Sequence, residues 1–344
     1  MAKAKKLPSG RWRTRLFIGY GVDGKAKYKS FTADTKKESE YLANEYHINN
    51  KILSESEILD LYIPEAVMNY IDLRRASLSP NTIRGYTTLF KNQIQLLNNT
   101  KMKNFNATEH QRWIDIIAEN VSPKTVKNAD GLIVATFRHY NIALKPISLP
   151  QKEYKEYKIP TTAEVKQIIE YFKDKKDKDM EIAVYLASTG TLRRGEVCAL
   201  RSEDIDRDNN TILVHRSIAI DENRNFIEKA PKTYTSNRTV ELPKFIIDML
   251  PKKGMVININ LHQVSRRFSK CIKKLELDKS YTFHSLRHYS ASIMHAQNIP
   301  TQYIMKRGGW KSESTLNRIY RNSLDDFEKS FTEITNDYFN KTLK

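Results

Sequence analysis

Residues 282–288, which read Thr-Phe-His-Ser-Leu-Arg-His, constrain the fold of this 344-residue chain more than any other stretch. They combine two histidines and an arginine at the expected end of an element. Four more residues whose side chains could act together with them lie at predicted element ends elsewhere in the sequence: Arg193, Glu196, Trp310 and Tyr320. The chain must therefore fold so that these distant positions meet in one place.

This set of residue types suits the attack of a tyrosine hydroxyl on a phosphodiester without a metal ion. Such an attack builds negative charge on the phosphate, and arginine supplies a planar, permanently charged donor that can neutralise it. His284 and His288 are four residues apart and invite comparison with a zinc pair. No glutamate or third histidine follows at zinc-protease spacing, so we expect no metal site and no cofactor.

The order of these residues resembles the signature of the tyrosine recombinases, the integrase family, which is Arg … Lys … His-x-x-Arg … His/Trp … Tyr. The resemblance implies that Arg193 and Arg287 bind the scissile phosphate and that His284 donates to it. Trp310 can contribute only its indole N–H. Tyr320 is then the nucleophile, which forms a 3′-phosphotyrosyl link and releases a 5′-hydroxyl.

Two supporting roles and one ambiguity follow from the same resemblance. The family reads Thr-Gly-(Leu/Met)-Arg-x-x-Glu, and this chain has one additional residue between Gly190 and Arg193. Either Arg193 or Arg194 can therefore be the phosphate ligand, although the spacing to Glu196 favours Arg193. Glu196 is expected to act as a supporting carboxylate, and His288 to serve in packing and hydrogen bonding.

A predicted hairpin supplies the lysine of the signature. Residues 231–238 read Pro-Lys-Thr-Tyr-Thr-Ser-Asn-Arg and resemble the family's Lys-Thr-x-x-Ser-x-Arg hairpin, whose lysine protonates the leaving 5′ oxygen. A lysine suits this role because its ammonium is a compact donor whose pKa shifts when water is removed. We assign the role to Lys232 rather than to Lys229.

The composition favours a polyanionic partner, which here means double-stranded DNA. The formal net charge is +18 and the sequence pI is about 9.6. Cys198 and Cys271 lie in apolar helical patterns without metal-ligand spacing, as expected for reduced core thiols of a cytoplasmic, nucleoid-associated protein. No apolar run approaches the ~18–20 residues that a membrane span needs, so no membrane partner is expected.

Residues 1–55 are predicted to form an arm-type DNA-binding domain, made of a small three-stranded sheet and a helix. Residues 22–24 read as the turn of a hairpin. Strict alternation places every second residue of each hairpin strand on one face, and these residues are cationic: Arg11, Arg13, Arg15, Lys25, Lys27 and Lys29. We expect both strands to present these six cations on one surface that binds DNA. The alternative is a solvated hairpin whose lysines serve solubility.

Two further domains are expected. Residues 60–145 read as an all-helical, SAM-like core-binding domain, because Ser79-Pro80 and Ser122-Pro123 suit helix starts and lead into amphipathic patterns. A linker with three prolines precedes the mixed α/β catalytic domain of residues 158–344. The predicted fold class is therefore multidomain α+β.

The resemblance implies a site-specific integrase of a mobile element such as a prophage. It would act as a homotetramer on two paired att sites and exchange strands through a Holliday junction. Relatives of this kind work with an excision (directionality) factor and a host DNA-bending protein. The helical tail of residues 324–344 packs either on its own domain or on a neighbouring protomer. Two alternatives are a type IB-like topoisomerase, which needs no paired sites, and a non-catalytic DNA-binding regulator.

Overall fold

The computed structural model of the chain describes residues 4–20, 26–49, 54–151, 158–229, 237–320 and 325–342. Contacts divide the chain into two compact units. One contains residues 1–77 and 86–152, and the other contains residues 78–85 and 153–344. None of the described helices is both long and apolar enough to cross a membrane.

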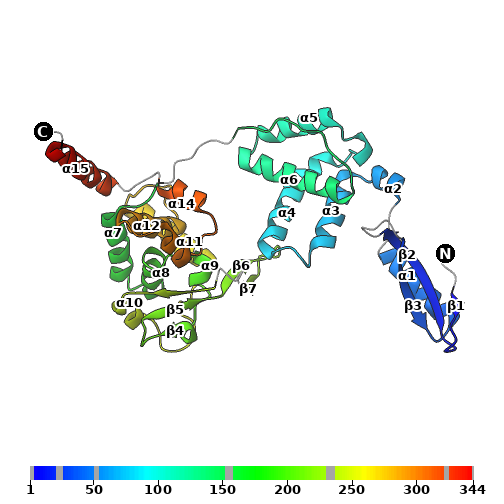
Figure 1. Cartoon of the computed structure of the whole chain (residues 1–344), viewed down its shortest axis with the longest axis horizontal. Coiled ribbons are helices and arrows are strands. Elements are labelled where there is room, and N and C mark those ends of the chain that lie inside the picture. Colours follow the sequence, from blue (N-terminus) through cyan, green and yellow to red (C-terminus); the bar gives the residue numbers. More distant parts are fainter. Residues whose placement is uncertain are drawn as a thin grey trace. The chain divides into compact units, whose positions relative to one another are not determined.

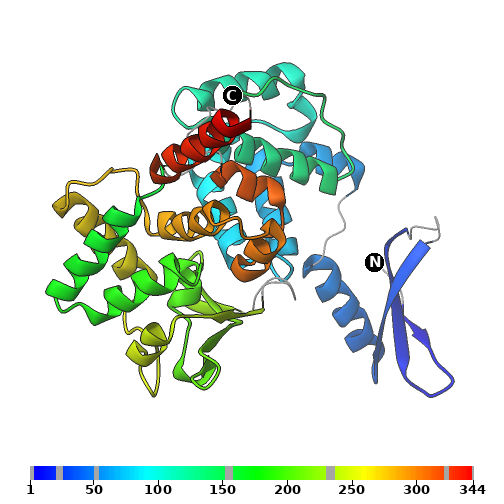
Figure 2. The same cartoon turned by 60° about the vertical axis from the view of Figure 1, so that its left-hand side comes forward.

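The N-terminal segment forms the predicted three-stranded sheet and helix (Figures 1 and 2). Its elements are β1 (Lys5–Lys6), β2 (Trp12–Tyr20), β3 (Ala26–Ala33) and α1 (Lys36–Asn49). Thr14 is fully buried on the face of β2 that meets α1, where its hydroxyl lies 2.8 Å from the hydroxyl of Ser39. Arg13 and Arg15 alternate with Thr14 and are exposed, as the alternation predicts.

The prediction that both strands carry their cations on one surface is wrong for Lys29. Strands β2 and β3 are antiparallel, with Arg15 opposite Ser30 and Leu16 opposite Lys29. Directly opposite residues share a face of the sheet, so Lys29 lies on the Leu16 side and not on the face of Arg13 and Arg15. The alternation within each strand does not determine which faces coincide, because a register shift of one residue exchanges them.

The structure does not test the predicted face for the other two lysines, Lys25 and Lys27. Lys25 and the expected turn at residues 22–24 lie outside the described residues. The backbone of Lys27 pairs with Gly19, beyond a β-bulge between Phe17 and Gly19. A bulge adds a residue to one strand and changes the local pairing, which the sequence pattern did not indicate.

A helical bundle follows, and both predicted Ser-Pro helix starts are confirmed. Its elements are α2 (Glu55–Asp60), α3 (Ile63–Arg74), α4 (Pro80–Asn92), α5 (Ala107–Ala118) and α6 (Pro123–His139), with 3-10 turns at Ile94–Leu97 and Met102–Asn104. The hydroxyls of Ser79 and Ser122 accept hydrogen bonds from the backbone N–H groups of Thr82 and Thr125. The apolar faces of α3, α5 and α6 share one core.

The second unit combines helices with two small antiparallel sheets. Its helices are α7 (Thr162–Asp174), α8 (Lys178–Ser188), α9 (Arg194–Val197), α10 (Lys244–Met249), α11 (Leu261–Lys274), α12 (Phe283–Ala296), α13 (Thr301–Gly308), α14 (Glu313–Tyr320) and α15 (Asp325–Thr342), with a 3-10 turn at Ser202–Asp204. Its strands are β4 (Ile205–Asp206), β5 (Thr211–Val214), β6 (Ser217–Ile220), β7 (Phe226–Lys229) and β8 (Arg238–Glu241). The sheet order is β4-β5-β8, and β6 pairs with β7 as a separate hairpin.

Helix α8 lies at the centre of this unit. It is buried along most of its length, because its sequence from Met180 to Ser188 is apolar on most faces, and it packs against α7 and α12. The end of α8 leads to Gly190, and the start of α12 carries His284 and Arg287. The packing of α8 against α12 therefore brings the two halves of the predicted signature together.

Candidate active site

The turn between α8 and α9 is strained. Thr191 follows Gly190 with φ of 58°, a left-handed conformation that a β-branched residue rarely adopts. Thr191 is fully buried; its carbonyl accepts a hydrogen bond from Nη1 of Arg287, and its hydroxyl lies 3.3 Å from the carbonyl oxygen of Arg307. The one additional residue that this chain has relative to the family pattern lies in this turn. The strained backbone thus presents a carbonyl to the buried arginine.

Glu196 holds two arginines from different elements. Its carboxylate accepts hydrogen bonds from the backbone N–H of Arg193 at 2.9 Å, from Arg193 Nη1 at 2.7 Å and from Arg238 Nη2 on β8 at 2.7 Å. Nε of Arg238 donates to the carbonyl of Arg307 at 2.8 Å. Burial alone would raise the pKa of Glu196, but hydrogen bonds and charge from Arg238, together with Arg193, lower it to about 2. The carboxylate is therefore ionised at neutral pH.

The turn after α13 is fixed by Arg193 and by two glycines. Nη2 of Arg193 donates to the carbonyl of Gly309 at 2.9 Å, and Gly309 adopts the left-handed conformation that ends α13. The indole of Trp310 occupies the space where a side chain of Gly308 would lie, since a Cβ there would come within 1.8 Å of the ring. Only glycine at position 308 allows the indole to fold back in this way.

Arg287 is the buried centre of the site. Its side chain is 1% exposed, and Cζ lies 3.7 Å from the ring centroid of Trp310, a cation–π distance. Nη1 donates to Thr191, whereas Nε and Nη2 have no hydrogen-bond partner among the described residues. Burial and the nearby charge of Arg193 lower the pKa of Arg287. Two buried donors without an acceptor are costly unless an anion binds them.

The two histidines of α12 lie beside this arginine. The rings of His284 and His288 are 4.6 Å apart between centroids and meet edge to face. Partial removal of water by the surrounding protein, with the charges of Arg287 and Arg193, lowers the pKa of His284 to about 4. Burial, His284 and Arg287 lower the pKa of His288 to about 3. Both rings are therefore neutral at pH 7, and His284 can donate only as a neutral imidazole until an anion binds.

A cleft joins His284 to the second candidate arginine. Arg194 lines this cleft and donates from Nη1 to the hydroxyl of Ser265 on α11. Lys229, at the end of β7, also lines it. Gly195 allows α9 to approach β6 closely, because a Cβ there would come within 2.6 Å of the carbonyl oxygen of Ile218. The structure therefore brings His284 and both arginines of the turn to one cleft.

The structure does not describe the side chains of two predicted catalytic residues, Lys232 and Tyr320. Lys232 lies outside the described residues, which resume at residue 237 just before β8. Tyr320 is the last residue of α14, and only its backbone is described. Both roles stay predictions.

Three residues that build this site have no role predicted from the sequence. Thr191 and Arg238 supply contacts to Arg287 and Glu196, and Ser265 receives Arg194. The available signal was weak: Arg238 ends the hairpin pattern, and the chain has one additional residue after Gly190 relative to the family pattern.

Three arginines of the N-terminal segment, far from the active-site residues in the sequence, belong to the predicted DNA-binding surface. Nε of Arg11 donates to Oδ1 of Asp34 at 2.8 Å, and Cζ of Arg15 lies 4.7 Å from the ring centroid of Tyr28. Arg11, Arg13 and Arg15 are all exposed. They form an arginine face that can bind an anionic partner.

Comparison with known proteins identifies related sequences along most of the chain. Residues 159–326 match the phage integrase family. A tyrosine recombinase XerC-like protein of Caldanaerobacter subterraneus subsp. tengcongensis is 26% identical over 377 residues, covering 95% of this chain and 96% of that protein. The integrase of Staphylococcus phage L54a is 24% identical over 339 residues, covering 83% of this chain and 95% of that protein.

Solved structures share the fold at lower sequence identity. The Tn1549 transposon integrase in complex with transposon right end DNA is 16% identical with a TM-score of 0.66, covering 79% of this chain and 99% of that one. The lambda integrase tetramer bound to a Holliday junction is 14% identical with a TM-score of 0.59, covering 93% and 95%. The predicted multidomain α+β class is confirmed. Residues 159–326 of the chain thus form a phage integrase domain, the domain of the tyrosine recombinases, which are enzymes that cleave and rejoin DNA strands.

The Glu196 contacts carry a prediction on stability. Glu196→Gln is expected to lower the free energy of unfolding by about 3 kcal/mol at pH 7, because it leaves the buried Arg238 without its charge partner. The folded-state pKa of Glu196 is depressed, so its contribution is complete above pH ~4.5 and is lost as the pH falls towards 2. Urea denaturation at several pH values should therefore show the two proteins converge below pH ~4.5.

Glu203→Gln is the matched control, because Glu203 also binds an arginine, Arg216, but its side chain is 63% exposed. It is expected to cause a much smaller loss. An equal loss for both variants, or a difference that does not depend on pH, would contradict the assignment of Glu196 as a buried charged partner.

Proposed function

We propose that the chain is the integrase of a mobile genetic element, and that it recombines two specific DNA sites through a 3′-phosphotyrosyl intermediate. Attack by a tyrosine hydroxyl breaks the bond between phosphorus and the 5′ oxygen and links the phosphate to the enzyme. The reverse attack by a 5′-hydroxyl of the other strand restores a phosphodiester and frees the tyrosine. Both steps conserve the phosphodiester bond energy, so no energy source is needed.

The observation that carries this proposal is the pair of buried, unpartnered donors on Arg287. They lie on a side chain that is fixed by Thr191 and by the ring of Trp310. Preorganised cationic donors stabilise the charge that develops on a phosphate because they need not reorient during the reaction. An anion in this position would also relieve the cost of burying the guanidinium.

Each remaining residue has a role in this proposal. Arg193, held by Glu196 and by the carbonyl of Gly309, is the second phosphate ligand, and these contacts favour it over Arg194. His284 donates to a phosphate oxygen as a neutral imidazole. Tyr320 is the nucleophile and Lys232 the acid for the leaving oxygen, on the strength of the sequence pattern.

The proposed assembly is a tetramer on two paired sites that passes through a Holliday junction. Support comes from the lambda integrase tetramer bound to such a junction, whose fold this chain shares. The arginine face of the N-terminal sheet is proposed to bind arm-type DNA, and the helical bundle to bind the core site. We propose that an excision factor and a host DNA-bending protein set the direction of recombination.

The test is covalent trapping on a nicked suicide duplex that carries the element's candidate junction, in a buffer with a metal chelator. We expect a denaturation-resistant adduct, and peptide mass mapping should find the DNA on one tyrosine. Relaxation of supercoiled plasmids that lack the junction, at the same rate as plasmids with it, would favour a type IB-like topoisomerase. Tight binding to a verified junction without any adduct would overturn the catalytic proposal and favour a regulator.

A further inference from the structure

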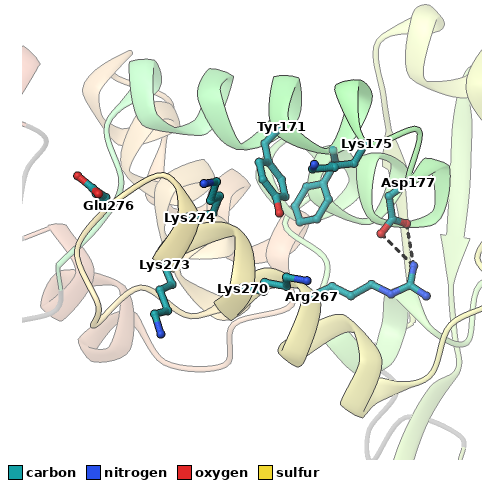
Figure 3. A pocket seen from close by; sticks show the side chains of 9 residues that line it. Tyr171, Lys175, Asp177, Arg267, Lys270, Lys273, Lys274 and Glu276 are labelled. Carbon is teal, nitrogen blue, oxygen red and sulfur yellow. Dashed lines mark hydrogen bonds and ion pairs between the residues drawn. The ribbon is translucent and has the colours of Figure 1, made fainter.

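A second basic cleft lies between α7 and α11, and nothing in the active site uses it (Figure 3). Its volume is about 700 Å³. The cationic residues that line it are Lys175, Arg267, Lys270, Lys273 and Lys274. Asp177 and Glu276 lie at opposite ends of the row of cations in Figure 3. We propose that this cleft binds the phosphates of a DNA segment other than the one at the active site.

The protein does not balance the charge of the lysines in this cleft. Arg267 forms an ion pair with Asp177 at 2.8 Å, but within the described residues none of the four lysines has a carboxylate at ion-pair distance. Lys273 and Lys274 follow Lys270 by three and four residues, so both charges lie next to that of Lys270 on α11 and repel it. A helix that keeps repelling neighbours without an internal partner is expected to meet an external anion.

Helix α11 directs these side chains away from the active-site cleft. Ser265 faces the active-site cleft, where it contacts Arg194. Residues two positions apart on an α-helix point about 200° apart, given 3.6 residues per turn. Arg267 therefore leaves α11 on another side, and Lys270 and Lys274 continue along the same stripe. The stripe therefore lines a different cleft from the active site and is available for phosphates elsewhere.

The lining of the cleft suits DNA better than an acidic peptide. A bound peptide normally anchors an apolar side chain in a pocket, but Phe172 beneath this cleft is only 2% exposed. The partly buried Tyr171 is the other aromatic residue that lines it. The cleft thus offers mainly ammonium groups on flexible stems, which suit phosphates as point charges irrespective of base sequence. The inference takes DNA as partner from the proposed function.

Either of two DNA segments could supply these phosphates, and both present the same phosphate backbone. One is the flank of the duplex whose core lies at the active site, and the other is a second duplex. The variant to use is Lys270→Gln/Lys273→Gln/Lys274→Gln in the full chain. The matched control is Lys166→Gln/Lys252→Gln/Lys253→Gln, which removes the same charge from exposed positions outside the cleft. Thermal unfolding should show that both variants remain folded.

The measurement is the salt dependence of DNA affinity by fluorescence anisotropy. Each phosphate contact contributes about 0.9 to the slope of log affinity against log salt. For the cleft variant we expect the magnitude of this slope to be smaller by about 2. The decrease should appear either with a duplex extended beyond the core or with a labelled second duplex added to the protein–core complex. The assay in which the slope decreases identifies the DNA that supplies the phosphates. On the core duplex alone, affinity and adduct formation should match the control.

Slopes equal to those of the control variant in both arms would overturn the proposal. If, in addition, polyglutamate binds the wild type and not the cleft variant, the cleft belongs to an acidic polypeptide instead. Failure of the wild type to form an adduct on the core duplex would count against the proposed function alone, because the salt slopes do not depend on cleavage.

Discussion

Tyr320→Phe is expected to abolish the covalent protein–DNA adduct while DNA affinity stays the same. The substitution removes only the hydroxyl that would attack phosphorus, and phenylalanine keeps an aromatic ring at position 320. Loss of a nucleophile removes the route through the covalent intermediate, and in comparable enzymes it costs at least about four orders of magnitude in rate. The suicide duplex assay with a metal chelator measures the adduct, and anisotropy measures binding.

Tyr303→Phe and Tyr338→Phe are the controls for this prediction. Tyr303 is 51% exposed on α13 and Tyr338 is 63% exposed on α15, so both are accessible tyrosines near the C-terminal end. Neither substitution is expected to change adduct formation. An adduct that persists in Tyr320→Phe but disappears in one of these variants would move the nucleophile to that tyrosine.

Arg287→Lys is expected to lower the rate of adduct formation by about 10²–10³-fold at saturating DNA. Arg287 combines two contacts and a pair of unpartnered donors, which one ammonium cannot reproduce. It donates to the carbonyl of Thr191, stacks on Trp310 and keeps two further donors for an anion. Lysine lacks the planar fork and the stacking surface, so conservation of charge does not conserve the geometry.

Arg207→Lys separates this catalytic effect from a structural one. Arg207 also uses its fork on backbone carbonyls, those of Ile247, Leu250 and Pro251, but these contacts are outside the candidate site. It should lower stability without lowering the adduct rate of the folded protein. A rate for Arg287→Lys within ten-fold of the wild type would show that Arg287 is not a preorganised phosphate ligand.

The sequence by itself determined the local features of this protein. Side-chain alternation predicted the exposed Arg13 and Arg15, and the Ser-Pro pairs predicted the starts of α4 and α6. These features depend on neighbours within a few residues, so a linear pattern contains them. The order of the signature residues also indicated that the start of α9 and the start of α12 belong to one site, because it resembles a known family.

Only the tertiary structure decided how distant residues meet. The pairing of Leu16 with Lys29 reversed the predicted face of a lysine, since strand register depends on partners that alternation does not specify. The strained Thr191, the charge pair of Glu196 with Arg238 and the unpartnered donors of Arg287 depend on contacts between segments far apart in the chain. Their geometry arises from packing around α8, and no local periodicity encodes it.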